Sequence, residues 1–122
     1  MPRILLVEDH EALAALRCAV LRQQKYRVVM TGDGREACRL LENEPFDLVI
    51  TDSELASGSG WEVARAARKR HVPVILSTGW PPRAPQSREV DFVLAKPSTT
   101  TRFLALIHLA LQKPKAQSSA RK

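Results

Sequence analysis

Short runs of consecutive apolar residues alternate with helical patterns along this chain, and this alternation restricts the possible folds more than any other feature. The runs predict strands over residues 4–7, 27–31, 48–50, 72–76 and 91–95. Apolar runs without polar alternation are typical of strands buried on both faces, as in a parallel sheet that helices cover on each side. Five such strands in alternation with helices predict an α/β fold with a doubly wound five-stranded parallel sheet.

Apolar residues at helical spacing predict four helices, over residues 11–24, 35–44, 61–70 and 99–112. In the first helix, the spacing indicates that the core-facing side chains are those of Leu13, Leu16, Val20 and Leu21. Asp33 stands where it can cap the second helix, and Pro45 ends that helix.

Length and charge predict one domain over residues 1–112 and a basic tail over residues 113–122. A chain of 122 residues accommodates one ordinary domain. The net charge of +6 is concentrated in the last ten residues, because the rest of the chain holds 15 basic against 13 acidic residues. The tail is rich in Pro, Ser, Ala and Gln, so we expect a disordered tail or a linker there.

Composition disfavours several classes of protein. No apolar run approaches the ~20 residues of a membrane span, and the N-terminus lacks a signal-peptide pattern. Cys18 and Cys38 fit no metal-binding or disulfide pattern, which favours a reduced, cytoplasmic protein in which both thiols are small buried hydrophobes. Nucleic-acid binding is not expected, because aromatic residues are few and no nucleic-acid-binding motif is present.

Polar residues follow the predicted strands at their carboxyl ends, where ligands bind in sheets of this kind. Glu8 and Asp9 follow the first strand, and Asp52 follows the third. Ser77 and Thr78 follow the fourth strand, and Lys96 follows the fifth. Since parallel strands end at one edge of the sheet, we expect three carboxylates, a pair of hydroxyls and an ammonium group to converge there.

This set of groups suits phosphoryl transfer assisted by a metal ion. Three adjacent carboxylates repel one another, and a hard cation with oxygen ligands, namely Mg²⁺, would relieve that repulsion. One carboxylate would then be available as a nucleophile towards phosphorus. The cation and the lysine would stabilise the charge on the transferred group, which is the main task of a protein in this reaction.

The ordered set resembles the response-regulator receiver domain of two-component signalling, which has a chemotaxis-regulator-like fold. The resemblance covers about residues 3 to 112, and the matching residues are 4–9, 47–52, Gly60, 73–79 and the pair Lys96-Pro97. It implies a flavodoxin-like sheet with strand order 2-1-3-4-5 and helices on both faces. It also implies a phosphorelay module that is not an enzyme, receives its phosphoryl group from a sensor histidine kinase or a histidine phosphotransfer protein, and signals by binding an unknown output protein.

By position, the resemblance implies that Asp52 is the phosphoacceptor and also a ligand of Mg²⁺. Asp9 would bind the ion directly, and Glu8 would bind it through a water molecule. Glu54, two residues after the acceptor, would offer its backbone carbonyl to the metal.

Thr78 and Lys96 complete the implied site. The Thr78 hydroxyl would move towards the phosphoryl group, and the Lys96 ammonium would pair with that group. The family commonly has a cis bond between the lysine and the following proline, so we expect the cis isomer at Lys96-Pro97.

Three positions depart from the family pattern. Ala56 replaces the proline usual four residues after the acceptor, so the glycine-rich loop 56–60 is expected to be looser. Val93 replaces an aromatic switch residue, and Phe92 is expected to face the opposite side of the strand. The segment 79–90 is short and holds three prolines, so the fourth helix is expected to be missing or reduced. Because that helix is part of the usual output and dimer surface, a homodimer stays an open possibility.

Two other functions are compatible with parts of the sequence. A receiver-like protein-protein interaction module with impaired phospho-switching would fit Val93 and the proline-rich segment. A phosphatase or phosphotransferase with an aspartyl nucleophile, similar to haloacid-dehalogenase-like enzymes, would use the same residue types. In those enzymes the nucleophile follows the first strand within an Asp-x-Asp motif, whereas Asp52 follows the third strand and precedes Ser53 and Glu54.

Overall fold

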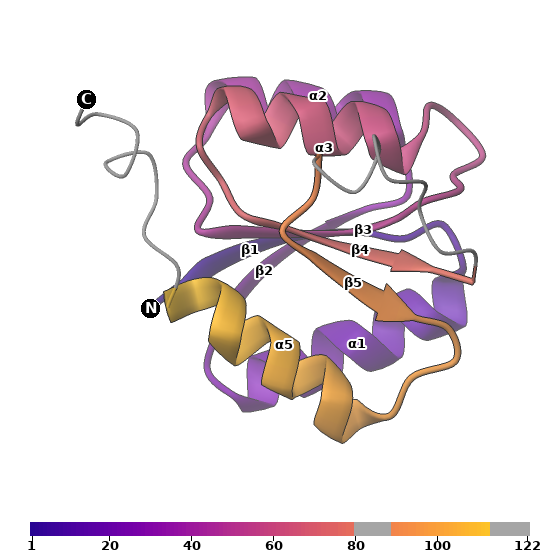
Figure 1. The fold of residues 1–122 in the computed structure, drawn as a ribbon, viewed down its shortest axis with the longest axis vertical. Helices are drawn as coiled ribbons and strands as arrows, with labels where there is room; N and C mark the ends of the chain where they lie inside the picture. Colours follow the sequence, from indigo (N-terminus) through magenta and orange to yellow (C-terminus); the bar gives the residue numbers. More distant parts are fainter. Residues whose placement is uncertain (80–88, 113–122) are drawn as a thin grey trace.

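Five strands and four helices alternate along the part of the chain that this computed structural model describes, residues 1–79 and 89–112 (Figure 1). The strands are β1 (Arg3–Val7), β2 (Arg27–Thr31), β3 (Leu48–Asp52), β4 (Val74–Thr78) and β5 (Phe92–Ala95). The helices are α1 (Glu11–Gln23), α2 (Gly34–Asn43), α3 (Gly60–Lys69) and α5 (Thr100–Gln112). Each bound lies close to the bound that the sequence predicts.

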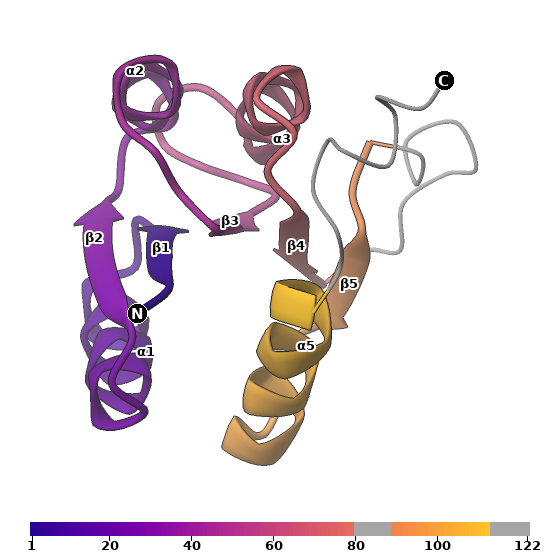
Figure 2. The ribbon, with the colours of Figure 1, turned by 90° about the vertical axis from the view of Figure 1, so that its left-hand side faces the viewer.

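All five strands are parallel and form one sheet in the order β2-β1-β3-β4-β5, so the predicted doubly wound topology is confirmed. Helices α2 and α3 cover one face of the sheet, and α1 and α5 cover the other (Figure 2). The strand order reverses between β1 and β3, which is the point where ligands bind in open α/β sheets. The residues that follow β1 and β3 therefore stand next to each other.

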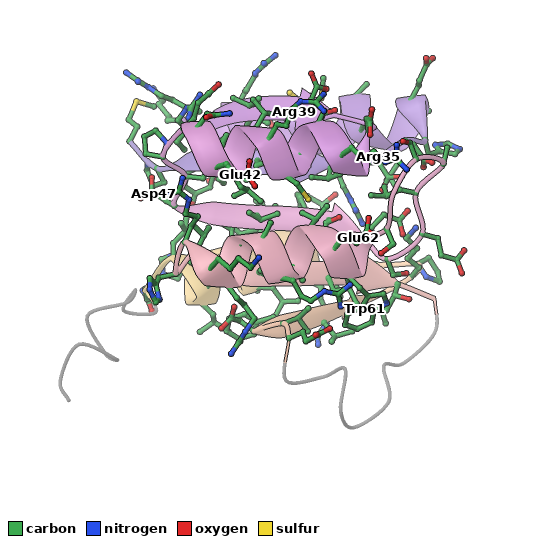
Figure 3. The ribbon with its side chains drawn as sticks, turned by 90° about the horizontal axis from the view of Figure 1, so that it is seen from above. Arg35, Arg39, Glu42, Asp47, Trp61 and Glu62 are labelled. Carbon is green, nitrogen blue, oxygen red and sulfur yellow. The ribbon has the colours of Figure 1, made fainter. Side chains whose placement is uncertain are left out.

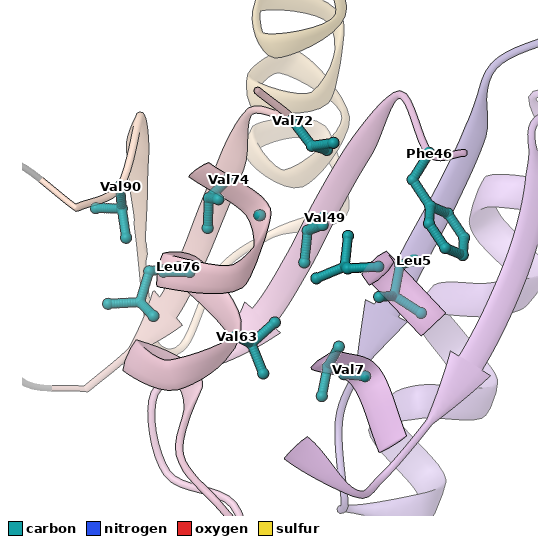
Figure 4. Close-up of a cluster of buried hydrophobic side chains, with 13 residues drawn as sticks. Leu5, Val7, Phe46, Val49, Val63, Val72, Val74, Leu76 and Val90 are labelled. Atoms are coloured by element: carbon teal, nitrogen blue, oxygen red, sulfur yellow. The ribbon is translucent and has the colours of Figure 1, made fainter. Parts of the chain in front are cut away.

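Two apolar clusters, one on each face of the sheet, form the core. Successive side chains of a strand supply the two faces in turn. Leu5 and Val7 pack on the side of α2 and α3, whereas Ile4 and Leu6 pack on the side of α1 and α5. Figure 4 shows the first of these clusters, to which α3 contributes Val63. Figure 3 looks onto α2 and α3, which lie side by side above it.

Helix α1 faces the sheet with a different stripe from the one that the spacing predicts. Leu21 is buried, as expected, but Leu16 is 58% exposed. Arg17 and Cys18 occupy the inward positions instead. The prediction for Leu16 is wrong because apolar spacing assigns only apolar residues to the buried side of a helix. Here the charged Arg17 takes a buried position, since it contacts the buried carboxylate of Glu8.

The cap of α2 and the state of the two cysteines can both be compared with the sequence predictions. The Asp33 side chain accepts a hydrogen bond of 2.8 Å from the backbone N–H of Arg35, so the predicted cap is confirmed. Cys18 and Cys38 are both free thiols, and Cys18 is buried. Cys38 is only half-buried, which departs from the expectation that both thiols are fully inside.

The edge strand β5 confirms the predicted alternation of side chains. Phe92 packs against the cluster on the side of α1 and α5, and Val93 packs against the opposite one.

The predicted loss of the fourth helix concerns mainly residues 80–88, and the predicted tail covers residues 113–122. Both segments lie outside the described residues.

Candidate functional site

The carboxyl ends of β1, β3, β4 and β5 bring the predicted polar residues to one edge of the sheet. Asp52 ends β3 and pairs in register with Ser77 of β4. The alternation of side chains directs Glu8, Asp52, Ser77 and Lys96 to the face that α1 and α5 cover, because Leu6, Ile50, Ile75 and Leu94 lie two residues before them on that face. Thr78 follows Ser77 directly on β4, so its side chain points to the opposite face of the sheet, which α2 and α3 cover.

Three carboxylates form the acidic part of the site. Glu8, Asp9 and Asp52 each offer one oxygen, and these oxygens all lie within 4.8 Å of one another. Glu8 and Asp52 are buried, whereas Asp9 is exposed. An open cluster of carboxylate oxygens suits a hard cation that keeps part of its water shell, so the donor set fits Mg²⁺.

The ammonium group of Lys96 lies directly against the buried aspartate. Its Nζ donates a hydrogen bond of 2.7 Å to Oδ2 of Asp52. Lys96 precedes a cis peptide bond to Pro97, as predicted. Because the Asp52 side chain is only 8% exposed, water screens this charge-assisted hydrogen bond only weakly.

The loop after β3 is fixed to the acidic residues by backbone hydrogen bonds. The N–H of Glu54 donates to Oδ1 of Asp52 at 3.3 Å, and the N–H of Ala56 donates to Oδ2 of Asp9 at 2.7 Å. At the end of the loop, Gly60 lies so close to β3 that a Cβ there would stand 2.0 Å from the carbonyl oxygen of Asp52. The glycine thus allows α3 to begin against β3.

The Thr78 hydroxyl has a partner that sequence reasoning missed. Ser53 donates a hydrogen bond from its Oγ to Oγ1 of Thr78 over 2.9 Å. Ser53 follows Asp52 directly, and its backbone N–H also donates to the carbonyl of Ser77 at 3.0 Å. The pairing of β3 with β4, together with the alternation of side chains, is the signal that would have found this contact.

Arg17 of α1 is a second residue that the sequence analysis missed. Its Nη1 lies 3.7 Å from Oε1 of Glu8 and donates a hydrogen bond of 3.3 Å to Oγ of Ser77. Burial raises the pKa of the Glu8 carboxyl above its ordinary value, while the hydrogen bond from the His10 N–H acts in the opposite direction. Burial also lowers the pKa of the Arg17 guanidinium. The two side chains form a buried ion pair, in which Glu8 is also a member of the acidic cluster.

His10, which follows the acidic pair, caps α1. Its Nδ1 accepts a hydrogen bond of 3.3 Å from the Leu13 N–H. The Asp9 carboxylate accepts from the loop at Ala56, and it stays within reach of Asp52.

The family of the chain follows from a comparison with known proteins. A family model described as the response regulator receiver domain matches residues 4–108. This chain belongs to the receiver domain family. A receiver domain is a signalling module of two-component systems and not an enzyme, so the alternative of an aspartyl-nucleophile phosphatase does not hold. Receiver domains interact with histidine kinases.

Curated relatives are longer than this chain. The regulatory protein VirG of Rhizobium rhizogenes is 31% identical over 121 residues, which make up 92% of this chain and 49% of VirG. The CAI-1 autoinducer sensor kinase/phosphatase CqsS of Vibrio cholerae is 34% identical over 82 residues, which make up 63% of this chain and 12% of CqsS. The chain thus spans about half or less of these proteins.

Solved structures of receiver domains share the fold. The receiver domain of sensor histidine kinase PA1611 from Pseudomonas aeruginosa, which has a magnesium ion in its active-site cleft, is 27% identical with a TM-score of 0.82, covering 92% of this chain and 98% of that one. The response regulator TrrA from Thermotoga maritima, in complex with Mg²⁺ and BeF, is also 27% identical, with a TM-score of 0.83 and coverage of 90% and 99%.

Among residues 1–79 and 89–112, no helix combines the length and the apolar character that a membrane crossing requires.

Proposed function

We propose that this receiver domain accepts a phosphoryl group on Asp52 in a reaction that depends on Mg²⁺. The observation that carries the proposal is the position of the Asp52 carboxylate. It is buried, it accepts a hydrogen bond from Lys96, and it lies within 4.8 Å of two further carboxylates. A nucleophile between a cation-binding cluster and a fixed ammonium group is suited to attack a negatively charged phosphoryl group.

The residues that would hold the metal are Glu8, Asp9 and Asp52, together with the backbone carbonyl of Glu54. Mg²⁺ bound by these groups supplies positive charge to the oxygens of the incoming phosphoryl group. Similar receiver structures that contain Mg²⁺ support this choice of ion. In this chain, the hydrogen bond from the Ala56 N–H to Asp9 orients the exposed member of the cluster.

In the transfer step, one oxygen of the Asp52 carboxylate forms a bond to phosphorus while the bond between phosphorus and the donor's imidazole nitrogen breaks. The imidazole keeps the electron pair of that bond and takes a proton from solvent. Lys96, whose Nζ already donates to Asp52, stays paired with the product, an aspartyl phosphate. Thr78 would then donate its hydroxyl hydrogen to a phosphoryl oxygen, for which its hydrogen bond with Ser53 has to rearrange.

The proposed donor is a phosphohistidine on a sensor histidine kinase or a histidine phosphotransfer protein, in the cytoplasm. The match to CqsS, named as a sensor kinase/phosphatase, supports a partner of this class. The signal would pass to an output protein through a change of surface, and a homodimer is one form that this output could take.

Phosphorylation by phosphoramidate tests the proposal, because this small donor has the same phosphorus–nitrogen bond as phosphohistidine. We expect the wild-type chain to gain one phosphoryl group by intact mass spectrometry, and D52N to gain none. A chelator of divalent cations should strongly reduce the gain. D33N is the matched control, since Asp33 is a carboxylate outside the acidic cluster and asparagine caps helices as well as aspartate. Equal labelling of D52N and wild type would overturn the proposal.

A second candidate function is a receiver-like interaction module whose surface does not respond to phosphorylation. The observation that favours it is Val93, which packs against the cluster of α2 and α3 where the family has an aromatic switch residue. The two functions differ in the NMR spectrum of residues 89–95 on addition of Mg²⁺ and beryllofluoride. Shifts there support a working switch, whereas binding of the mimic without such shifts supports the interaction module.

A further inference from the structure

Arg17 is a charged side chain that points into the protein behind the acidic cluster. Its side chain is 8% exposed, and its partner Glu8 is 1% exposed. Three elements hold the guanidinium in place. It contacts Glu8 after β1, donates to the Ser77 hydroxyl on β4, and lies 5.0 Å from the ring centroid of Phe103 on α5. A guanidinium fixed in this way is a permanent positive charge in a defined position.

Stability alone does not explain the burial of this arginine. The separation of 3.7 Å between Nη1 and Oε1 of Glu8 is within ion-pair range but is too long for a hydrogen bond. Among the described residues, Oε1 of Glu8 has no hydrogen-bond partner. A buried ion pair with imperfect geometry costs more desolvation free energy than a well-packed apolar pair would. The position of Arg17 therefore points to an electrostatic role.

That role follows from the charges at the strand ends. Lys96 is paired with Asp52 on the side of β5, and Arg17 approaches Glu8 from α1. Two of the three carboxylates therefore have a fixed cationic partner before any metal binds. Each added positive charge makes the cluster less attractive to a divalent cation, and a buried charge acts more strongly than an exposed one because water and salt screen it less.

We propose that Arg17 is a built-in counter-cation of the acidic cluster, which positions Glu8 and weakens the affinity of the cluster for divalent cations. This inference rests on the proposed Mg²⁺-dependent function of the same cluster. Arg17 is a positioning residue, since it acts through Glu8 rather than on the reacting atoms. Half-saturation of the site therefore requires a higher Mg²⁺ concentration than it would without Arg17.

The test is a calorimetric titration of Mg²⁺ at pH 8 into the wild type, R17M, R17K and R22M. Methionine keeps an unbranched side chain of similar length and a good helix propensity without the charge. R17K keeps the charge at the same position. R22M is the matched control, because Arg22 lies on the same helix, is exposed, and loses the same charge. Circular dichroism and thermal melting establish that each variant is folded.

We expect R17M to bind Mg²⁺ roughly tenfold more tightly than the wild type. R17K and R22M should stay within about twofold of the wild-type affinity. A purely structural role for Arg17 would change the melting temperature of R17M without tightening Mg²⁺ binding, and that result would overturn the proposal. Weaker Mg²⁺ binding by R17M would also overturn it. If R17M does not fold, R17Q provides the same test, because its amide can still bond to the Ser77 hydroxyl.

The outcomes separate this inference from the proposed function. If the wild type does not bind Mg²⁺ but R17M does, the Mg²⁺-dependent function of the natural chain fails while the counter-cation inference stands. If neither binds Mg²⁺, both fail. If both bind with equal affinity, the proposed function stands and the counter-cation inference fails.

Discussion

The two faces of the sheet are built differently although the same strands supply both. On the side of α2 and α3, the apolar cluster extends from Leu5 on β1 to Val90 before β5, and no charged residue among the described ones is buried there. On the side of α1 and α5, the apolar cluster borders buried charged groups, namely Glu8, Arg17 and Asp52. The comparison indicates that the buried charge of the proposed site lies on one face, whereas the other face supplies the site with the Thr78 hydroxyl.

The largest expected effect concerns Gly60, the first residue of α3, which lies against Asp52 of the site. In G60A the new Cβ would stand 2.0 Å from the carbonyl oxygen of Asp52, so the backbone has to move. We expect a loss of more than ~3 kcal/mol in the free energy of unfolding, measured by urea denaturation. G79A is the matched control, because a Cβ at Gly79 meets nothing within 4 Å. A mild effect of G60A would contradict this packing.

Truncation of leucines tests which residues belong to the two faces. Leu5 is fully buried on the side of α2 and α3, so L5A should lower the free energy of unfolding by about 2–5 kcal/mol. Leu16 is exposed on α1, and L16A should cost no more than ~0.5 kcal/mol. Chemical denaturation of both variants measures the difference. Similar losses in the two variants would indicate that Leu16 is buried, as the apolar spacing predicts.

The helix caps give a smaller contrast between the two layers. Asp33 caps α2 with a hydrogen bond of 2.8 Å, whereas His10 caps α1 with a longer one of 3.3 Å. D33A should therefore lower the melting temperature more than H10A does. Thermal melting measures both. If H10A costs more than D33A, the order of cap strengths inferred from these geometries is wrong.

The smallest expected effect is a pH dependence of the charged face. Burial raises the pKa of Glu8 above its ordinary value of 4.5. The folded state therefore binds more protons than the unfolded state in the window from pH 4.5 up to the raised pKa, and its stability falls as pH rises through that window. Without Mg²⁺, wild-type stability should thus decline relative to E8Q, which does not titrate, as pH increases from 4 to 8 in denaturation experiments. A rise relative to E8Q would contradict the raised pKa.

Periodicity in the sequence predicted five buried parallel strands in a doubly wound sheet. The polar residues after the strands predicted the edge where Asp52 and Lys96 meet, whereas the strand order was implied by the resemblance to receiver domains. The rule of alternating side chains also predicted that Phe92 and Val93 face opposite ways, as the clusters confirm. These features depend on local pattern and on topology, and both can be read from a single chain.

The residues that sequence reasoning missed depend on contacts between distant parts of the chain. Ser53 and Thr78 meet because β3 and β4 pair in a particular register. Arg17 is inward because Glu8 and Ser77 lie on the same face, whereas its residue type alone indicates a solvent-exposed position. Neither contact has a local signal, since Ser53 and Arg17 look like ordinary surface residues until their three-dimensional neighbours are known.

The account depends most directly on the identity of the phosphorylated residue. The chain is phosphorylated with phosphoramidate and Mg²⁺, the acyl phosphate is reduced with borohydride, and peptide mass spectrometry locates the resulting homoserine. We predict modification at position 52 and at no other aspartate. Modification at Asp9 or another carboxylate, with Asp52 left intact, would contradict the account.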